Sequence, residues 1–410
     1  MSFMTRALKL GALAAALLAF AGLAQAATLR VTIAEYSAKT GPFFNEVARA
    51  FEKDNSDTKV QIEVVPWDVL RQKLDTDIAA GANADLAIIG TRWLIDFVKA
   101  GIVEPLDGTI PAEVTGRFIE PFLRPSNMDG KLYGLPVAAS ARALYYNTEI
   151  LGKAGVDGPP KTWDDLVADA KKVKALGGDA IGFGLQGKEI ETDVYFYYAM
   201  WSYGGEIVQN GKSGLGSDAA LKAATLYKGL IDQGLTQQGV TAYNREDVQN
   251  LFKKGRVAMM ISAPFLASQI KTEAPNLKYA IAPVPAGTVS ASYGVTDSII
   301  LSKNSKAKAE AAKFLEFAFR PEWRKKFNLN EGFLPVLKSV AEMPEFKDNA
   351  DLKAFTQVLP NARFAPVIPG WEEIAEKTGA ALQSIYLGKG EPKPVLTDTA
   401  TSIDTILGAK

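Results

Sequence analysis

Short apolar runs alternate with segments of helical periodicity along most of this chain. Apolar residues at 29–33, 60–64 and 85–89 predict three strands. Between them, residues 44–51 and 67–80 place apolar side chains on one face of a helix, and the second of these helices ends at a glycine. A β-α-β-α-β opening is typical of a doubly wound lobe, whose ligands bind at the carboxyl ends of the strands.

The alternation continues to the end of the chain and predicts an α/β protein with mainly parallel sheets. Residues 143–146 form an expected strand, and Thr162 with Asp165 is a variant capping box that opens a helix ending at Gly177. A further strand is expected over 257–261. The other expected helices cover 217–231, 244–254, 306–319 (ended by Pro321), 371–387 and 396–407.

The first 26 residues have the pattern of a secretory signal. Arg6 and Lys9 precede an almost uncharged run over 10–23, and Ala24-Gln25-Ala26 is the small-x-small site that a signal peptidase needs. The run is shorter than the roughly 20 residues that span a bilayer. We expect cleavage after Ala26 and a periplasmic product, not a lipoprotein, because the sequence has no cysteine to carry a lipid.

Charge and composition exclude several classes of function. Without residues 1–26 the chain keeps 44 Lys and Arg against 46 Asp and Glu, a net charge of −2, so nucleic acid is a poor candidate partner. The sequence has no histidine and no cysteine, which excludes thiol nucleophiles, serine-histidine triads and the usual zinc sites. Its length of 410 residues, 47% of them hydrophobic, predicts two domains.

Several segments together resemble the family 1 extracellular solute-binding proteins of ABC importers, the sugar-binding group that includes maltose-binding protein. They follow the family's order across nearly the whole chain. These segments are Ala84-Asp85-Leu86, Tyr133-Gly134-Leu135-Pro136, Leu144-Tyr145-Tyr146-Asn147, residues 159–166 (PPKTWDDL), Gly204-Gly205, residues 252–262 (FKKGRVAMMIS), residues 282–287 (APVPAG) and Phe314-Leu315-Glu316-Phe317.

The resemblance implies a two-lobed periplasmic binding protein fold that traps its ligand by hinge closure. It places crossovers near Pro136, Pro283 and Pro335. Lobe 1 would comprise 27–136 plus about 284–335, and lobe 2 would comprise 137–283 plus about 336–410. The implied ligand is a sugar or polyol, and the implied partners are inner-membrane permease subunits and their ATPase. We expect a monomer without enzymatic activity, metal or cofactor.

Candidate ligand residues follow from the hydroxyls and C–H faces of a sugar, which need polar side chains beside aromatic rings. The first strand-to-helix loop and the third strand end supply the lobe 1 candidates, with Thr91 and Arg92 at a ligand position of the family. Arg92 at helical spacing from Asp96 could instead form a surface pair. The lobe 1 candidates are Tyr36, Ser37, Thr40, Trp67, Thr91, Arg92, Asp297 and Glu331.

The second lobe supplies the remaining candidates. Strand alternation puts Ser140 and Arg142 on the same side. Tyr197 and Trp201 share a helix face, a pattern also typical of a core. Phe265 and Trp371 match stacking tryptophans of maltose-binding protein. The lobe 2 candidates are Ser140, Arg142, Asp193, Tyr197, Trp201, Phe265, Arg363 and Trp371.

Two alternatives remain open from the sequence. Arg92, Arg142 and Lys39 beside neutral hydroxyls also suit an anionic ligand, such as a phosphorylated or sulfonated sugar, better than a polyamine. A secreted glycoside hydrolase would need two carboxylates such as Asp297 and Glu331, and no motif identifies such a pair.

Overall fold

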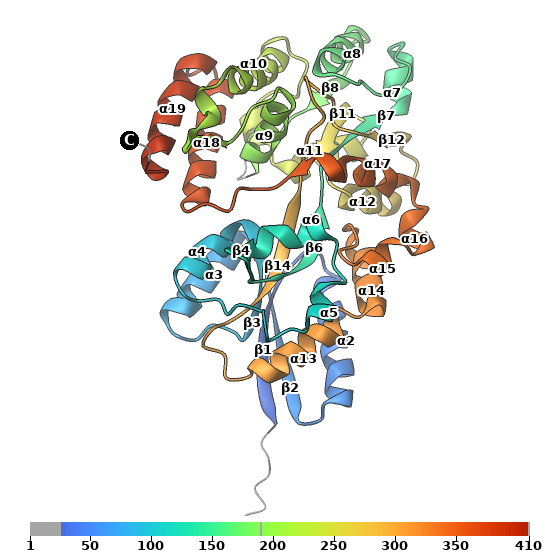
Figure 1. The fold of residues 1–410 in the computed structure, drawn as a ribbon. Helices are drawn as coiled ribbons and strands as arrows, with labels where there is room; N and C mark the ends of the chain where they lie inside the picture. The colour runs from blue at the N-terminus through green and yellow to red at the C-terminus, as the bar shows by residue number, and fades with distance from the viewer. Residues whose placement is uncertain (1–25, 189–190, 409–410) are drawn as a thin grey trace, which may run out of the picture.

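Two lobes, each built around its own β-sheet, lie one above the other in the computed structural model (Figure 1). The structure describes residues 26–188 and 191–408. The expected signal peptide therefore lies outside the described residues except for Ala26. Within this described part, no helix has the length and apolar character that crossing a bilayer requires.

The lower lobe in Figure 1 contains a five-stranded sheet of order β2-β1-β3-β14-β6. Strands β1, β2 and β3 pair in parallel, which confirms the predicted β-α-β-α-β opening. Strand β14 is antiparallel to both of its neighbours. The strands are β1 (Ala27–Ala34), β2 (Thr58–Val65), β3 (Leu86–Gly90), β6 (Leu135–Ser140) and β14 (Val295–Leu301).

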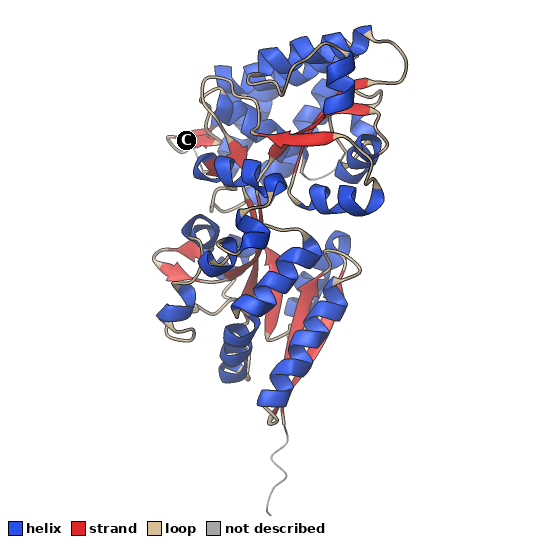
Figure 2. Ribbon diagram, turned by 90° about the vertical axis from the view of Figure 1, so that its right-hand side faces the viewer, coloured by secondary structure: helices blue, strands red, loops and turns tan. Residues whose placement is uncertain are grey.

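Helices cover this sheet (Figures 1 and 2). They are α2 (Thr40–Asp54), α3 (Trp67–Ala79), α4 (Leu94–Lys99), α5 (Ala112–Thr115), α6 (Glu120–Leu123), α13 (Lys308–Ala318), α14 (Pro321–Glu331) and α15 (Lys338–Ala341), with the 3-10 turn η1 (Thr91–Trp93) after β3, the turn η2 (Arg124–Ser126) and a small hairpin of β4 (Asn127–Met128) and β5 (Lys131–Leu132).

The upper lobe contains a four-stranded sheet of order β12-β7-β11-β8. Only β8 and β11 pair in parallel, whereas β7 is antiparallel to both β11 and β12. The sheets are therefore mixed and not mainly parallel, since β7 enters this lobe and β12 leaves it in the opposite direction. The strands are β7 (Ala143–Asn147), β8 (Ile181–Gly184), β11 (Val257–Ser262) and β12 (Tyr279–Ala282).

Helices surround the second sheet as well, and two of them, from the end of the chain, pack together on its outer side (Figure 1). The helices are α7 (Thr148–Lys153), α8 (Trp163–Ala175), α9 (Thr192–Ser202), α10 (Asp218–Asp232), α11 (Arg245–Lys253), α12 (Phe265–Glu273), α16 (Pro344–Lys347), α17 (Ala350–Val358), α18 (Trp371–Tyr386) and α19 (Pro392–Ile406). The 3-10 turns are η3 (Gly214–Gly216), η4 (Val240–Ala242) and η5 (Leu359–Asn361). Two short strand pairs are β9 (Val208–Gln209) with β10 (Lys212–Ser213), and β13 (Ser292–Tyr293) with β15 (Ala362–Arg363).

Local sequence signals account for several helix ends. Thr162 and Asp165 form the predicted capping box of α8, and Asn244 and Asp247 form another at α11. Pro321 lies at the first position of a new helix, α14, where its missing N–H costs nothing, so the predicted interruption becomes a helix start. The last helix begins at Pro392, four residues before the expected start, for the same reason.

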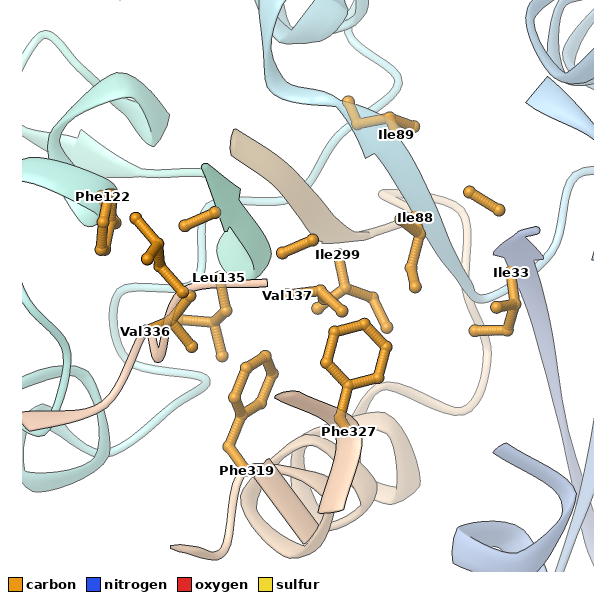
Figure 3. Close-up of a cluster of buried hydrophobic side chains, with 14 of the residues drawn as sticks. Ile33, Ile88, Ile89, Phe122, Leu135, Val137, Ile299, Phe319, Phe327 and Val336 are labelled. Carbon is orange, nitrogen blue, oxygen red and sulfur yellow. The ribbon is translucent and has the colours of Figure 1, made fainter. Parts of the chain in front are cut away.

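Apolar side chains fill the space between the sheet and the helices in each lobe. Figure 3 shows part of the first core, where Ile33, Ile88 and Ile299 from three strands face Phe327 of α14. The second core is rich in aromatic residues, and all of α9 is buried within it. These apolar contacts provide most of the free energy that stabilises each lobe.

Three segments connect the lobes. Strand β6 leads into β7, and β12 leads back to β14, so two of the connections join strands of different sheets. The third connection follows residue 338, whose backbone N–H still donates to Arg117 of the first lobe, whereas α17 packs on β7 and β12. The expected lobe boundaries depend on which segments move together as rigid bodies, so these boundaries stay a prediction.

Candidate ligand-binding cleft

An ion-pair cluster joins the two lobes where their facing ends meet. Arg92, in the turn after β3, donates from Nε to Glu372 Oε1 of α18 at 2.5 Å. Its Nη2 lies 3.6 Å from Asp193 Oδ2 of α9. The side chain of Asp193 is fully buried, and those of Arg92 and Glu372 are less than a fifth exposed. The two lobes are therefore closed on one another at this point.

A row of aromatic rings from the second lobe lies beside this cluster. Trp371 and Tyr197 have ring centres 5.8 Å apart, Tyr197 and Trp201 6.1 Å, and Trp201 and Tyr293 5.0 Å. The Arg92 guanidinium lies 5.6 Å from the Trp371 ring centre, within reach of a cation–π interaction. Flat rings next to charged and polar groups are what the C–H faces and hydroxyls of a sugar require.

Several buried polar atoms around this row have no hydrogen-bond partner among the described residues. They are both carboxylate oxygens of Asp193, the indole N–H groups of Trp201 and Trp371, and the hydroxyl of Tyr293. Buried polar groups in folded proteins are nearly always paired, because an unpaired one costs about 1–3 kcal/mol. Four side chains with this feature in one place indicate a site that a polar ligand completes.

Burial dominates the electrostatics of the cluster. It raises the pKa of Asp193 to about 7, although Arg92 opposes the change. Burial lowers the pKa of Arg92, but the carboxylates of Asp193 and Glu372 raise it above the ordinary value, so the guanidinium stays charged. The carboxyl of Asp193 therefore titrates near neutral pH.

We expect the stability of the protein to carry a pH dependence that comes from Asp193. The folded state holds this proton up to about pH 7, whereas the unfolded chain releases it near pH 4. The folded state thus binds more protons in between, and the unfolding free energy contributed by this group falls as the pH rises through that window. Asp193→Asn should reduce this fall in the unfolding free energy by at least about 1 kcal/mol. Denaturant unfolding of both proteins at pH 4.5 and 7.5 measures the difference, and an equal fall in the wild type and the variant would contradict the prediction.

A second cluster of charges surrounds Glu191, just before α9. Arg142 donates to Glu191 at 3.3 Å and to Ser140 Oγ at 3.1 Å, which puts Ser140 and Arg142 on the same side as predicted. Arg245 donates to the other Glu191 oxygen at 2.7 Å. Burial favours the neutral form of Glu191, but Arg245 and Arg142 hold its pKa below the ordinary value.

In the first lobe, the loop between β1 and α2 is fixed by Thr40. Its hydroxyl accepts the backbone N–H groups of Tyr36 and Ser37 and donates to Glu331 Oε1 at 2.8 Å. Burial raises the pKa of Glu331, while Ser37 and Thr40 lower it. Asp297, in β14, lies close to the Tyr36 hydroxyl, and burial raises the pKa of Asp297 to about 7. Thr40 thus organises the loop, and its own hydrogen bonds are fully used.

The remaining candidates occupy varied positions. Trp67 contacts Trp93 edge to face and Tyr36 in a tilted arrangement. Phe265 of the second lobe lies 5.8 Å from Phe333 of the first, so it lines the interface between them. Thr91 instead bonds Ser298 inside the first lobe at 2.7 Å.

The structure brings together six candidates at the interlobe cluster: Arg92, Asp193, Tyr197, Trp201, Arg363 and Trp371. The alternative pairing of Arg92 with Asp96 is wrong, because Asp96 lies 3.8 Å from Arg71 and Arg92 reaches across to the other lobe. Whether each candidate contacts a ligand stays a prediction.

Sequence reasoning missed three charged residues of the cleft: Glu191, Arg245 and Glu372. Glu372 could have been inferred from the sequence, because it directly follows Trp371 in the first turn of a helix, where acidic side chains are favoured. Glu191 and Arg245 carried no signal, because their pairing depends on contacts 54 residues apart. Among residues 26–188 and 191–408, no group of three Asp or Glu side chains is gathered as a metal site.

Comparisons with known proteins agree with this architecture. The model of the family described as bacterial extracellular solute-binding protein matches residues 34–325. A putative binding protein of Brucella abortus (strain 2308) is 65% identical over 394 residues, covering 95% of this chain and 96% of that protein. The galactooligosaccharide-binding protein of Bacillus subtilis (strain 168) is 26% identical and covers 89% and 86%.

A solved structure shows the same fold. The ABC transporter solute-binding protein of Thermotoga lettingae bound with α-D-tagatose has a TM-score of 0.85 at 25% identity, covering 93% of this chain and all of that one. The predicted two-lobed α/β fold is confirmed by this match. The family model covers well over half of the chain, and the chain therefore belongs to the bacterial extracellular solute-binding proteins.

Proposed function

We propose that this protein is the receptor of an ABC importer and captures a sugar or polyol between its two lobes. The observation that carries the proposal is the group of buried polar atoms of Asp193, Trp201, Tyr293 and Trp371 that have no hydrogen-bond partner among the described residues, beside an aromatic row at the lobe interface. Hydroxyls of a bound sugar would pair with these atoms, and its C–H faces would cover the rings.

The relatives support this ligand class. The Bacillus subtilis relative is named for galactooligosaccharide, and the Thermotoga lettingae structure holds tagatose. Membership of an extracellular family implies export. We propose in addition that the chain is cleaved after Ala26, acts in the periplasm as a monomer without a lipid anchor, and delivers its ligand to inner-membrane permease subunits driven by an ATPase.

We propose that binding occurs without catalysis. The family is one of substrate-binding proteins. Of the two carboxylates considered for glycoside hydrolysis, Glu331 accepts a hydrogen bond from Thr40, which occupies it with holding a loop. A general acid and a nucleophile or base would both have to face the scissile bond.

Residues 27–410 should gain thermal stability with at least one sugar or polyol from a panel of mono- and oligosaccharides, because a ligand that binds only the folded state raises the melting temperature. At 100 times its Kd such a ligand adds about 2.7 kcal/mol. The same ligand should reduce the radius of gyration in X-ray scattering if it favours the closed lobes over the open ones.

Uptake of that ligand at low concentration should then fail in a strain that lacks this protein and return when it is supplied. Normal uptake in the deletion strain would contradict the importer role, and a panel in which no sugar or polyol raises the melting temperature would contradict the ligand class.

A further inference from the structure

The guanidinium groups in the cleft are already paired with carboxylates. Arg92 has two carboxylate partners, Asp193 and Glu372, and they come from two different helices of the opposite lobe. Arg142 and Arg245 share Glu191, with distances of 3.3 and 2.7 Å. These contacts neutralise Arg92 and Arg142, two of the three cations that in the sequence alone suited an anionic ligand, whereas Lys39 donates to the backbone oxygen of Asn330.

Further pairs continue this pattern. Arg245 has a second partner in Glu246 at 2.6 Å. Arg363, whose guanidinium lies 4.9 Å from the Trp201 ring centre, is paired with Glu206. The side chains of Arg92, Arg142 and Arg245 are less than a quarter exposed, and those of their partners Asp193, Glu372 and Glu191 are no more than a fifth exposed. Each of these guanidinium groups is therefore already paired, and at Arg92 two carboxylates face one guanidinium.

This local excess of one carboxylate lies beside the aromatic row. Asp193 is fully buried, and its two oxygens have no hydrogen-bond partner among the described residues. Trp371, next to Glu372, forms the end of the aromatic row and lies under Arg92. A ligand stacked on this row would meet two carboxylates and one guanidinium that is already engaged.

An anionic group entering this space would meet the indole N–H groups of Trp201 and Trp371 as neutral donors, but it would have to break a buried ion pair to obtain a charged one. Breaking such a pair leaves an uncompensated charge, which is costly in a desolvated site. It would also lie close to carboxylates, and like charges brought together across an interface cost several kcal/mol. A sugar hydroxyl meets neither penalty, since it donates to a carboxylate and accepts from a guanidinium.

We infer that Asp193 and Glu372 select for uncharged sugars by neutralising Arg92 and by repelling phosphorylated or sulfonated ones. This inference rests on the proposed sugar-binding function and specifies the charge of the ligand. Asp193 and Glu372 are specificity-determining residues in this assignment. Arg92 holds them in place across the interface.

The test is Glu372→Gln, which keeps the shape of the side chain and removes its charge. The probes are the neutral sugar that binds best in the panel and its phosphate ester, titrated calorimetrically at pH 8. The wild type should bind the neutral sugar and reject the ester. In Glu372→Gln the ratio of the two affinities should move towards the ester by about tenfold or more, the equivalent of one removed like-charge contact.

Glu373→Gln is the matched control. Glu373 is the next residue of the same helix, but it is exposed and faces Lys377 at 3.7 Å. Its substitution should leave the ratio unchanged. Asp193→Asn is a second variant that removes the other carboxylate, and it should move the ratio in the same direction if Glu372→Gln does not fold.

The outcomes separate the two proposals. If neither the neutral sugars nor their esters bind to the wild type, the proposed function fails. If both bind the wild type equally well, the function stands and the charge selection is overturned. Equal losses for both probes in Glu372→Gln and Asp193→Asn would show a merely structural role and would also overturn it.

Discussion

Truncation of Trp371 to alanine is expected to lower the free energy of unfolding by about 3–5 kcal/mol, the usual cost of removing a buried tryptophan side chain. The side chain is 0% exposed and belongs to the core of the second lobe, together with Ile374 and Ile385 of the same helix. The ring contacts Tyr197 at 5.8 Å, so the change opens a cavity beside another aromatic residue.

The same residue is also a candidate ligand platform, because Arg92 of the other lobe lies over its ring and its N–H has no partner among the described residues. Trp371→Phe keeps most of the apolar surface and removes that N–H, so it should lose little stability. If Trp371 contacts the ligand, Trp371→Phe should still weaken binding, because a donor is lost.

Melting curves and calorimetric titration of both variants separate the two roles. A Trp371→Ala protein that melts like the wild type would contradict the burial, and a Trp371→Phe protein with unchanged affinity would contradict the ligand contact.

Local sequence signals predicted the elements well, for a physical reason. Helix faces, caps and apolar strands depend on neighbours within a few residues, and α8 with its capping box at Thr162 was predicted on that basis. The direction of a strand within a sheet depends on distant pairing. The antiparallel contacts of β7 with β11 and β12 therefore had no local signal, and the expectation of mainly parallel sheets was too simple.

The cleft was predicted in its residue types and only partly in its contacts. Arg92 was a candidate, but its bond with Glu372 joins positions 280 residues apart. Its nearby helical partner Asp96 was the better guess from spacing alone. Burial also cannot be read from a position at a helix start: Trp371 is the first residue of α18, yet it is fully buried and Arg92 of the other lobe lies over its ring.

Arg92→Ala should weaken ligand binding by about a hundredfold or more. The substitution removes the countercharge of Glu372 and of Asp193, for which burial already favours the protonated form, and removal of one partner from a buried ion pair costs about 3–5 kcal/mol. Each 1.4 kcal/mol corresponds to a factor of ten in affinity. The penalty should apply to the closed form, in which Arg92 of the first lobe meets both carboxylates of the second.

The loss should therefore appear in closure more than in folding. Arg92 lies in a turn of the first lobe, and its charged contacts are with the second. Scattering of the ligand-free variant should give a radius of gyration at least as large as that of the wild type, with a melting temperature close to it. Arg92→Lys keeps the charge but not the planar guanidinium, so its affinity for the ligand should lie between those of the wild type and Arg92→Ala.

A second substitution distinguishes this account from a general disruption of the cleft. If unpaired carboxylates oppose closure, Arg92→Ala combined with Glu372→Gln should bind more tightly than Arg92→Ala alone, because one of the two uncompensated charges is gone. Calorimetry on the four proteins of this double-mutant cycle measures the coupling. Independent, additive losses would mean that Arg92 acts on the ligand without these carboxylates, whereas partial recovery would show that its charge permits the lobes to close over them.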